Sequence, residues 1–247
     1  MWVSVYRPAL DAHNCHLPPG VPPTFWDIHD VAVRRDDSKK TKGYFSLPAL
    51  DYDAEAGVAP LFSPLQLKIH IFRYHQELVD ELNERTLGTI FEAQPLDVVI
   101  RKTALDATQV SLYHAASQHF NHSFFWKCIV PHGAPMPQSL KTALMRQYKT
   151  IALFEEKFQH AAASIHGSGW VFLVWTDIKF EILALTDPGG SPISMDYVPL
   201  CALDMWEHAR YIDYETDKES YVRNFFKVIN WKLVAKYWDR ASSQESV

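Results

Sequence analysis

The amino-acid sequence predicts an α+β fold in which helices come first and a small antiparallel sheet follows. Two observations carry this prediction. Apolar residues recur at helical spacing over much of residues 63–165, and three short β-prone runs follow after residue 169. The chain has 247 residues, of which 47% are hydrophobic. It is therefore long enough to bury a sizeable core in one large domain or two small ones.

Residues 1–43 differ in composition from the rest and are predicted to form an extension. Five of the 15 prolines fall between Pro8 and Pro23, which disfavours regular structure, and residues 34–43 indicate a charged linker. The extension nevertheless contains four large aromatic residues: Trp2, Tyr6, Phe25 and Trp26. Disordered tails are usually poor in such residues. We therefore expect this N-terminal arm to pack on its own domain or on a partner, such as a larger assembly.

Three helical stretches are predicted before the β-prone runs. The first begins at Ser63-Pro64, a favourable N-cap followed by a first-turn proline. Its apolar stripe is predicted to consist of Leu67, Ile71, Tyr74, Leu78 and Leu82. The second stretch runs from about residue 106 to 125, and the third from about 139 to 165.

The hydrophobic period then changes. Residues 170–175, 180–185 and 198–203 are short, bulky and β-prone, and residues 187–190 have the composition of a turn. A last helix is predicted over residues 221–237. Helices that precede a group of short strands are typical of α+β chains, so we expect a small three-stranded antiparallel sheet.

The bulk composition narrows the class of protein and its compartment. A net charge of -5 and a pI near 6.2 give no overall attraction to nucleic acid or anionic membranes. No apolar run approaches the roughly 20 residues that span a bilayer, so no direct membrane insertion is expected. Three cysteines without a C-x-x-C pair favour a reducing compartment, the mitochondrial matrix or alternatively the cytoplasm. The acid-containing N-terminus is atypical of a transit peptide, so either the chain has no such signal or it begins after one was removed.

Several segments, in order along the chain, resemble those of one enzyme family. They are residues 45–52, 118–126, 166–170, 204–211 and 230–231. On these segments the region from residue 44 to about 240 resembles the iron/manganese superoxide dismutases. The resemblance implies a helical-hairpin domain, here residues 44–133, followed by an α/β domain, residues 134–247, with a metal ion between them.

The resemblance also implies four metal ligands: His70, His122, Asp204 and His208. A single histidine is more often an ordinary core or surface residue, so the prediction depends on the contexts of these residues and not on their spacing. Neutral imidazoles suit iron and manganese, and one carboxylate partly offsets the metal charge. Iron is favoured, with manganese as the alternative, because Gln118 occupies the position from which iron-type members offer a glutamine to bound solvent. Gly189 falls near the position from which manganese-type members offer theirs.

Residues around the metal are assigned by the same resemblance. An aromatic wall that excludes bulk water would consist of Trp126, Trp170 and Trp206, which ordinary core packing would also explain. Glu207 would hydrogen-bond His208 of a second subunit, and Tyr211 would lie at the same interface. The implied partner is a second copy of this chain or a homologous subunit, and the implied substrate is superoxide.

The chain departs from the family at the substrate gateway. The family usually reads His-x-x-x-His-x-x-x-Tyr on its first helix, whereas here His70 is followed by Tyr74 and Leu78. Leucine has no hydrogen-bond donor and would interrupt the proton relay, while Tyr74 could return a hydroxyl from a different place. Lys218 stands where an arginine normally draws the anion inward. It keeps the charge and loses the planar fork.

Two functions from different classes follow as alternatives. The first is a superoxide dismutase that converts superoxide to oxygen and hydrogen peroxide at a mononuclear iron or manganese site. The complete ligand set, Gln118 and the tryptophan wall favour it. The second is a superoxide-dismutase-like structural subunit of a large mitochondrial assembly, such as the mitochondrial ribosome, with little or no activity. The N-terminal arm and the altered gateway favour that reading. The spacing of His13, Cys15, His16 and His29 fits no strong zinc pattern.

Overall fold

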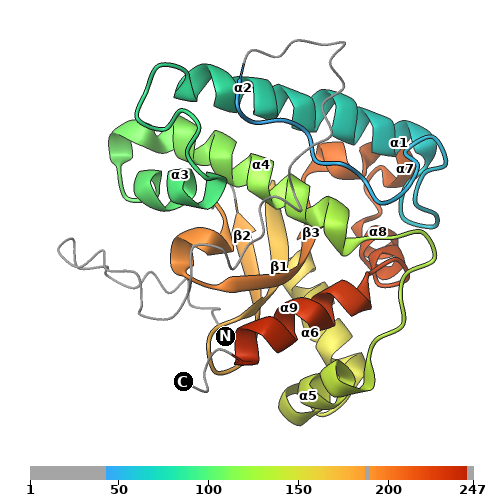
Figure 1. Cartoon of the computed structure of the whole chain (residues 1–247). Helices are drawn as coiled ribbons and strands as arrows, with labels where there is room; N and C mark the ends of the chain where they lie inside the picture. Colours follow the sequence, from blue (N-terminus) through green and yellow to red (C-terminus); the bar gives the residue numbers. More distant parts are fainter. Residues whose placement is uncertain (1–42, 187–189, 244–247) are drawn as a thin grey trace.

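The computed structural model describes residues 43–186 and 190–243. The predictions made for the N-terminal arm, and for Gly189 in the turn, therefore lie outside the described residues. Within the described ranges the chain forms a helical N-terminal hairpin followed by an α/β part with a three-stranded antiparallel sheet (Figure 1). The predicted fold class is confirmed.

The N-terminal hairpin has two long arms. One arm joins α1 (Pro64–Ile69), a π-helical segment η2 (His70–His75) and α2 (Gln76–Thr86), and the other arm is α4 (Val110–Cys128). Helix α3 (Leu96–Thr103) and the short 3-10 turn η3 (Ala107–Gln109) precede α4. Of the 19 residues of α4, 14 are buried, because α4 packs against α2 and α3 on one side and against the sheet on another. It is the central helix of the molecule.

The start of the first helix is confirmed, but its apolar stripe is partly wrong. The Ser63 hydroxyl caps the helix by accepting a hydrogen bond from the Gln66 backbone N–H (3.2 Å). Leu67, Ile71 and Leu82 are buried as predicted.

Tyr74 and Leu78 do not belong to this buried stripe. Tyr74 is 41% exposed and Leu78 is only half-buried, whereas His75 and Val79 are fully buried. The cause is η2, because a π-helical segment has more residues per turn than the α-helix on which the predicted spacing rests.

The sheet forms from the three predicted strands. They are β1 (Gly169–Trp175), β2 (Phe180–Thr186) and β3 (Val198–Asp204), in the order β2-β1-β3 with antiparallel pairing. Strand β1 is central and buried along its whole length. Strand β3 packs against α4, so the carboxyl end of this strand is placed beside the hairpin.

The predicted third and last helices are each broken into two. Residues 139–165 form α5 (Gln138–Tyr148) and α6 (Ile151–Ala163), separated at Lys149, whose φ is +72°. Residues 221–237 are divided between α8 (Lys218–Phe225) and α9 (Trp231–Ser242). Three short elements complete the described chain: η4 (Pro192–Met195), η5 (Glu207–Ala209) and α7 (Tyr211–Tyr214).

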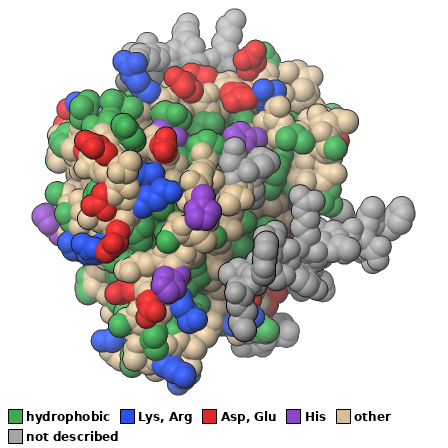
Figure 2. Space-filling view, turned by 180° about the vertical axis from the view of Figure 1, so that it is seen from behind, with side chains coloured by type: hydrophobic (Ala, Val, Ile, Leu, Met, Phe, Trp, Pro, Cys, Tyr) green, Lys and Arg blue, Asp and Glu red, His purple; other side chains and the backbone are tan. Residues whose placement is uncertain are grey.

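The surface agrees with the charge balance of the sequence. On the face shown in Figure 2, acidic and basic side chains are interspersed over the surface that the described residues form. In the part of the chain that the structure covers, none of the helices is long and apolar enough to cross a membrane.

Asn83 fastens the segment before the first helix onto α2. Its side chain is buried, accepts from the Phe45 backbone N–H and donates to the Phe45 carbonyl, both at 2.9 Å. We expect Asn83→Ala to lower the free energy of unfolding by roughly 2–4 kcal/mol, because two buried backbone groups lose their partners. Urea unfolding of the metal-free protein measures this.

A matched control is Gln76→Ala, which removes only an exposed hydrogen bond to Asp80 on the same helix. It should change the free energy of unfolding by less than about 0.5 kcal/mol. Equal effects of the two substitutions would contradict the role given to Asn83.

Candidate metal centre

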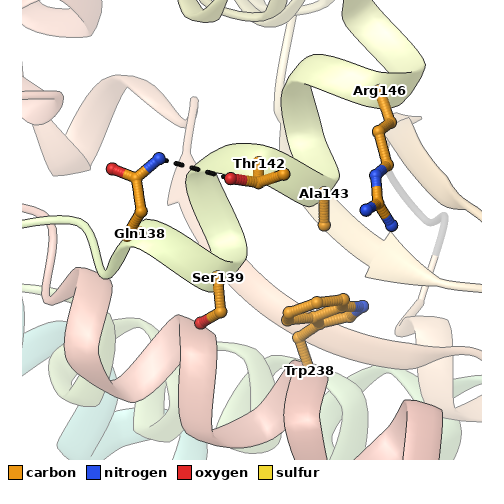
Figure 3. A pocket seen from close by; sticks show the side chains of 6 residues that line it. All are labelled: Gln138, Ser139, Thr142, Ala143, Arg146 and Trp238. Carbon is orange, nitrogen blue, oxygen red and sulfur yellow. Dashed lines mark hydrogen bonds between the residues drawn. The ribbon is translucent and has the colours of Figure 1, made fainter.

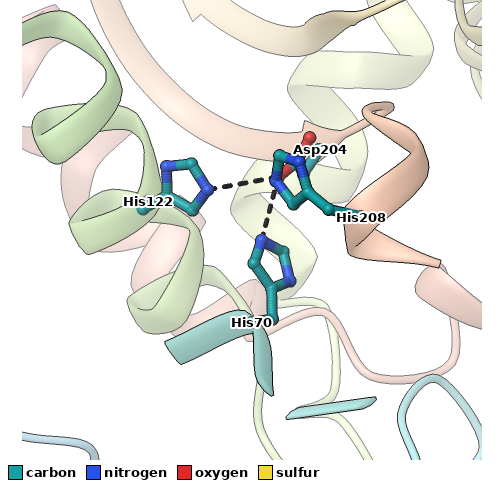
Figure 4. A group of neighbouring side chains, drawn as sticks. All are labelled: His70, His122, Asp204 and His208. Carbon is teal, nitrogen blue, oxygen red and sulfur yellow. Dashed lines mark hydrogen bonds and ion pairs between the residues drawn. The ribbon is translucent and has the colours of Figure 1, made fainter. Parts of the chain in front are cut away.

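Four side chains from distant parts of the sequence meet between the hairpin and the sheet. His70 lies at the start of η2, His122 on α4, Asp204 at the end of β3 and His208 in η5 (Figure 4). One ligand atom from each lies within 4.8 Å of all the others. The four residues predicted as metal ligands are thus brought together by the fold.

The carboxylate of Asp204 is the centre of the group. Its Oδ2 atom lies 3.1 Å from His70 Nε2, 3.4 Å from His122 Nε2 and 3.3 Å from His208 Nε2. Its Oδ1 atom accepts a hydrogen bond from the Trp206 backbone N–H (2.9 Å), which fixes the plane of the carboxylate. The side chains of the group are buried, with His208 the most accessible at 7%.

The donor atoms fit a transition-metal ion. His122 donates from Nδ1 to the Gln118 carbonyl (2.8 Å), so its Nε2 carries a lone pair directed at the other ligands. Among the described residues, the Nε2 atoms of His122 and His208 are buried and have no hydrogen-bond partner. Buried acceptors without partners are costly, and a metal ion would satisfy them. Three imidazole nitrogens with one carboxylate oxygen suit iron or manganese.

The protonation states also suit metal binding. Burial lowers the pKa of His70 to about 4, with partial compensation from Asp204, and burial lowers the pKa of His122 to about 3. Burial alone would raise the pKa of Asp204, but His208 and His70 outweigh it and hold that pKa below its usual range. At neutral pH, His70 and His122 are therefore neutral and Asp204 is ionised.

Mild acid is expected to destabilise the metal-free protein. An unfolded histidine titrates near 6.5, whereas His70 in the fold stays neutral down to about 4, so the unfolded state binds more protons in this window. The free energy of unfolding should therefore fall as the pH drops from 6.5 to 4, by on the order of 3 kcal/mol for His70 alone. Asp204 adds a loss only below its ordinary pKa near 3.8.

Urea unfolding of the metal-free protein at several pH values between 7.5 and 4 tests this dependence. His160 is exposed on α6, so His160→Gln should leave the slope unchanged. A flat pH profile for the unsubstituted protein would contradict the depressed pKa values.

Gln118 and the three tryptophans lie beside the ligands. Trp170 donates from Nε1 to Gln118 Oε1 (3.0 Å), and both are buried, so Gln118 is not a surface amide. This bond leaves the Gln118 Nε2 group as the donor of that side chain. The tryptophan rings adjoin three different ligands: Trp170 at His122 (5.0 Å between centroids), Trp126 at His70 (4.7 Å) and Trp206 at His208 (5.5 Å). Their assignment as a wall against bulk water stays a prediction.

Two of the predicted gateway residues, Tyr74 and Lys218, make specific contacts. The Tyr74 ring stacks on the His208 imidazole, with centroids 3.8 Å apart and an interplanar angle of 20°. Lys218 begins α8, and its Nζ donates to the Ile165 carbonyl (2.9 Å). The cation predicted to draw the anion inward is thus bound to a backbone group, and its role stays a prediction.

Sequence reasoning did not identify several residues that support the ligands. Gln66 is fully buried, donates to the His208 carbonyl (2.7 Å) and accepts from the Ile212 backbone N–H (3.1 Å), so α1 braces the loop that carries His208. The buried Tyr221 hydroxyl donates to the Asp204 carbonyl (2.8 Å). The available signal was a glutamine next to the apolar stripe of the first helix, one turn before His70.

Two further buried imidazoles, His75 and His119, lie next to the metal centre and were also not predicted as part of it. Their nearest nitrogens, His75 Nε2 and His119 Nδ1, are 2.8 Å apart. Trp126 donates from Nε1 to His75 Nδ1 (3.0 Å). Burial lowers the pKa of His119 to about 4 and that of His75 well below its usual value, so both are neutral.

A separate pocket lies between α5 and α9 (Figure 3), with a volume of about 340 Å³. Its lining residues are Gln138, Ser139, Thr142, Ala143, Arg146 and Trp238. None of these is a histidine, a cysteine or a carboxylate. The pocket therefore does not belong to the metal centre.

Comparison with known proteins identifies the family. Residues 44–130 match the family of iron/manganese superoxide dismutases, alpha-hairpin domain, and residues 136–237 match iron/manganese superoxide dismutases, C-terminal domain. Proteins named superoxide dismutase [Fe] from Salmonella typhimurium and Escherichia coli K12 are each 36% identical over 194 residues, 78% of this chain and 97% of the relative. The protein of that name from Synechocystis is 33% identical over 193 residues, 77% of this chain and 96% of the relative.

These relatives carry the name of an enzyme that uses iron. Their names do not support the alternative of a structural subunit in a mitochondrial assembly. Both family matches, the fold and the convergent group of His70, His122, Asp204 and His208 point to one conclusion. The chain belongs to the iron/manganese superoxide dismutase family.

Proposed function

We propose that this protein is a superoxide dismutase with one iron ion, or alternatively manganese, held by His70, His122, Asp204 and His208. The reaction consumes two superoxide anions and two protons and yields one oxygen molecule and one hydrogen peroxide molecule. The observation that carries the proposal is the buried group itself: neutral imidazoles and one ionised carboxylate with their donor atoms within 4.8 Å.

A bound iron ion supplies the one-electron chemistry by alternating between the trivalent and divalent states. The side chains provide the rest. The Asp204 carboxylate offsets part of the cationic charge, and His70 and His122 keep their lone pairs at neutral pH. Trp170 orients Gln118, whose Nε2 group can then donate a hydrogen bond to a solvent molecule in the site. Trp126 and the other two tryptophans limit the access of bulk water.

Iron is the proposed metal because Gln118 offers its amide from the middle of α4. The iron-containing relatives support this choice. The residues 44–133 and 134–247, proposed as two domains, would each supply two ligands, so the metal would join them.

Proton delivery is the step most affected by the departures from the family. Leu78 has no hydroxyl, and the Tyr74 ring lies flat against His208. We infer that Gln118 and solvent deliver protons without a tyrosine at position 78. The missing hydroxyl lowers turnover relative to a complete relay. Lys218 contributes positive charge that draws superoxide inward.

A dimer is proposed on the side of the molecule where η5 and α7 lie. Glu207 and Tyr211 are exposed in the single chain, and Tyr211 is 54% exposed. Phe72, on the neighbouring π-helical segment, is 53% exposed. Such apolar exposure next to a metal ligand is typical of a subunit interface, across which Glu207 would hydrogen-bond His208 of a second copy. A reducing compartment would keep the buried thiols of Cys128 and Cys201 free.

The test combines metal analysis with turnover. The full chain is loaded with iron or with manganese, bound metal is quantified, and superoxide decay is followed after a radiolytic pulse. We expect about one metal ion per chain and faster superoxide decay with iron than with manganese. Stoichiometric metal with no acceleration of decay would contradict the enzymatic function. Native mass spectrometry tests the dimer.

A further inference from the structure

The proposed chemistry leaves unused the buried pair His75 and His119 beside the ligands. His75 is 0% exposed and His119 is 4% exposed. Together with Trp126 they form a chain of two hydrogen bonds, of 3.0 Å and 2.8 Å, that connects η2 with two turns of α4. Buried polar groups arranged in this way restrict each other's positions.

The direction of this chain follows from the chemistry of its members. An indole nitrogen can only donate, so Trp126 Nε1–H must donate to His75 Nδ1. A neutral imidazole carries one proton, which His75 must therefore hold on Nε2 and donate to His119 Nδ1. His119 in turn must hold its proton on Nε2. Each member thus has a single tautomer and a single orientation.

Two of the proposed metal ligands, His122 and His70, contact the rings of this hydrogen-bond chain. The His75 ring lies nearly parallel to the His122 ring, with centroids 5.1 Å apart and an interplanar angle of 25°. The Trp126 ring meets His70 edge to face at 4.7 Å and 80°. In an α-helix, residue 75 would point about 140° away from residue 70. The π-helical segment, in which the turn spans five residues, brings His75 back toward the ligands.

We propose that His75 is a positioning residue of the metal centre, held in place by His119, and that it sets the orientation of His122 and, through Trp126, of His70. Its effect on turnover rests on the proposed function, whereas the hydrogen-bond chain itself does not. Residues that orient metal ligands from behind typically change metal affinity or activity by about 10–100-fold when replaced.

Two substitutions at His119 separate this role from simple packing. His119→Leu removes the acceptor for His75 Nε2–H but fills the space, whereas His119→Asn keeps an acceptor at the position of Nδ1. Each variant is loaded with trivalent iron, and its electron paramagnetic resonance spectrum and its azide dissociation constant are measured. We expect His119→Leu to alter the rhombic splitting and to change azide affinity at least about threefold. His119→Asn should restore the values of the unsubstituted protein.

His160→Leu, the same substitution at an exposed position on α6, is the control and should change neither readout. An unaltered spectrum and azide affinity in His119→Leu would overturn the proposal.

Nitrogen-15 NMR of the metal-free protein supplies a measurement that depends on neither metal nor turnover. We expect His75 to be protonated on Nε2 and the Trp126 indole proton to exchange slowly. A His75 protonated on Nδ1 would overturn the inference while leaving the proposed function intact. Absent superoxide turnover with these NMR signatures present would contradict the function and leave the inference standing. If His119→Leu does not fold, the NMR result and His119→Asn decide.

Discussion

Replacing His122 with leucine is expected to abolish metal binding and superoxide removal while preserving the fold. His122 lies in the centre of α4, and its Nε2 atom has no partner among the described side chains other than the ligand group. Leucine fills a similar volume, and the Gln118 carbonyl keeps its helical partner four residues later. Loss of a direct ligand should exceed the roughly 10–100-fold effect of losing an outer partner, so bound metal should fall below about a tenth of an ion per chain.

Metal analysis of the purified variant and pulse radiolysis measure the two effects. The matched control is again His160→Leu, which should retain full metal and turnover because His160 is exposed on α6. Urea unfolding of the metal-free proteins should give similar midpoints for both variants. A His122→Leu protein that still binds one metal ion would place the metal elsewhere.

The strands were the elements best predicted from sequence, because their signals are local. Each of β1, β2 and β3 is a short run of bulky residues, and the observed bounds differ from the predicted ones by one residue at most. The helix start at Ser63 was equally local, since a capping hydroxyl and a following proline define it.

The helix interruptions could not be predicted, because no residue at them is a strong helix breaker. Lys149 has a positive φ of +72°, a backbone conformation that favours glycine, and Thr150 then caps α6. The π-helical segment has no composition of its own. It moved Tyr74 outward and His75 inward relative to the 3.6-residue period that the prediction used.

The residues of the candidate site likewise divide into those that the sequence predicted and those that it did not. The four predicted ligands stand in distinctive sequence contexts, so the resemblance to the family was enough to predict a group that the fold brings together. Gln66 and His119 stand in no such context. Helix α4 is buried on all sides, so periodicity cannot tell a polar residue that supports a ligand from one that only fills the core.

Restoring a tyrosine at position 78 is expected to raise turnover by roughly tenfold, a fraction of the 10²–10⁴-fold that positioned acid–base groups contribute. Leu78 lies half-buried on α2, which packs against α4, the helix that carries Gln118. Because Trp170 occupies the Gln118 oxygen, the Gln118 Nε2 group remains to donate to a new hydroxyl. The metal content should not change, since position 78 is not a ligand.

Leu78→Phe separates the hydroxyl from the added ring. If the missing donor limits proton delivery, Leu78→Tyr should turn over superoxide faster than both Leu78→Phe and the unsubstituted protein, with the gain confined to kcat. Stopped-flow measurements at saturating superoxide compare the three. Equal rates for the two variants would mean that another group already delivers the proton. The Tyr74 hydroxyl would then be the first to test, because its ring is held against His208 and Tyr74→Phe removes the donor without removing the stacking.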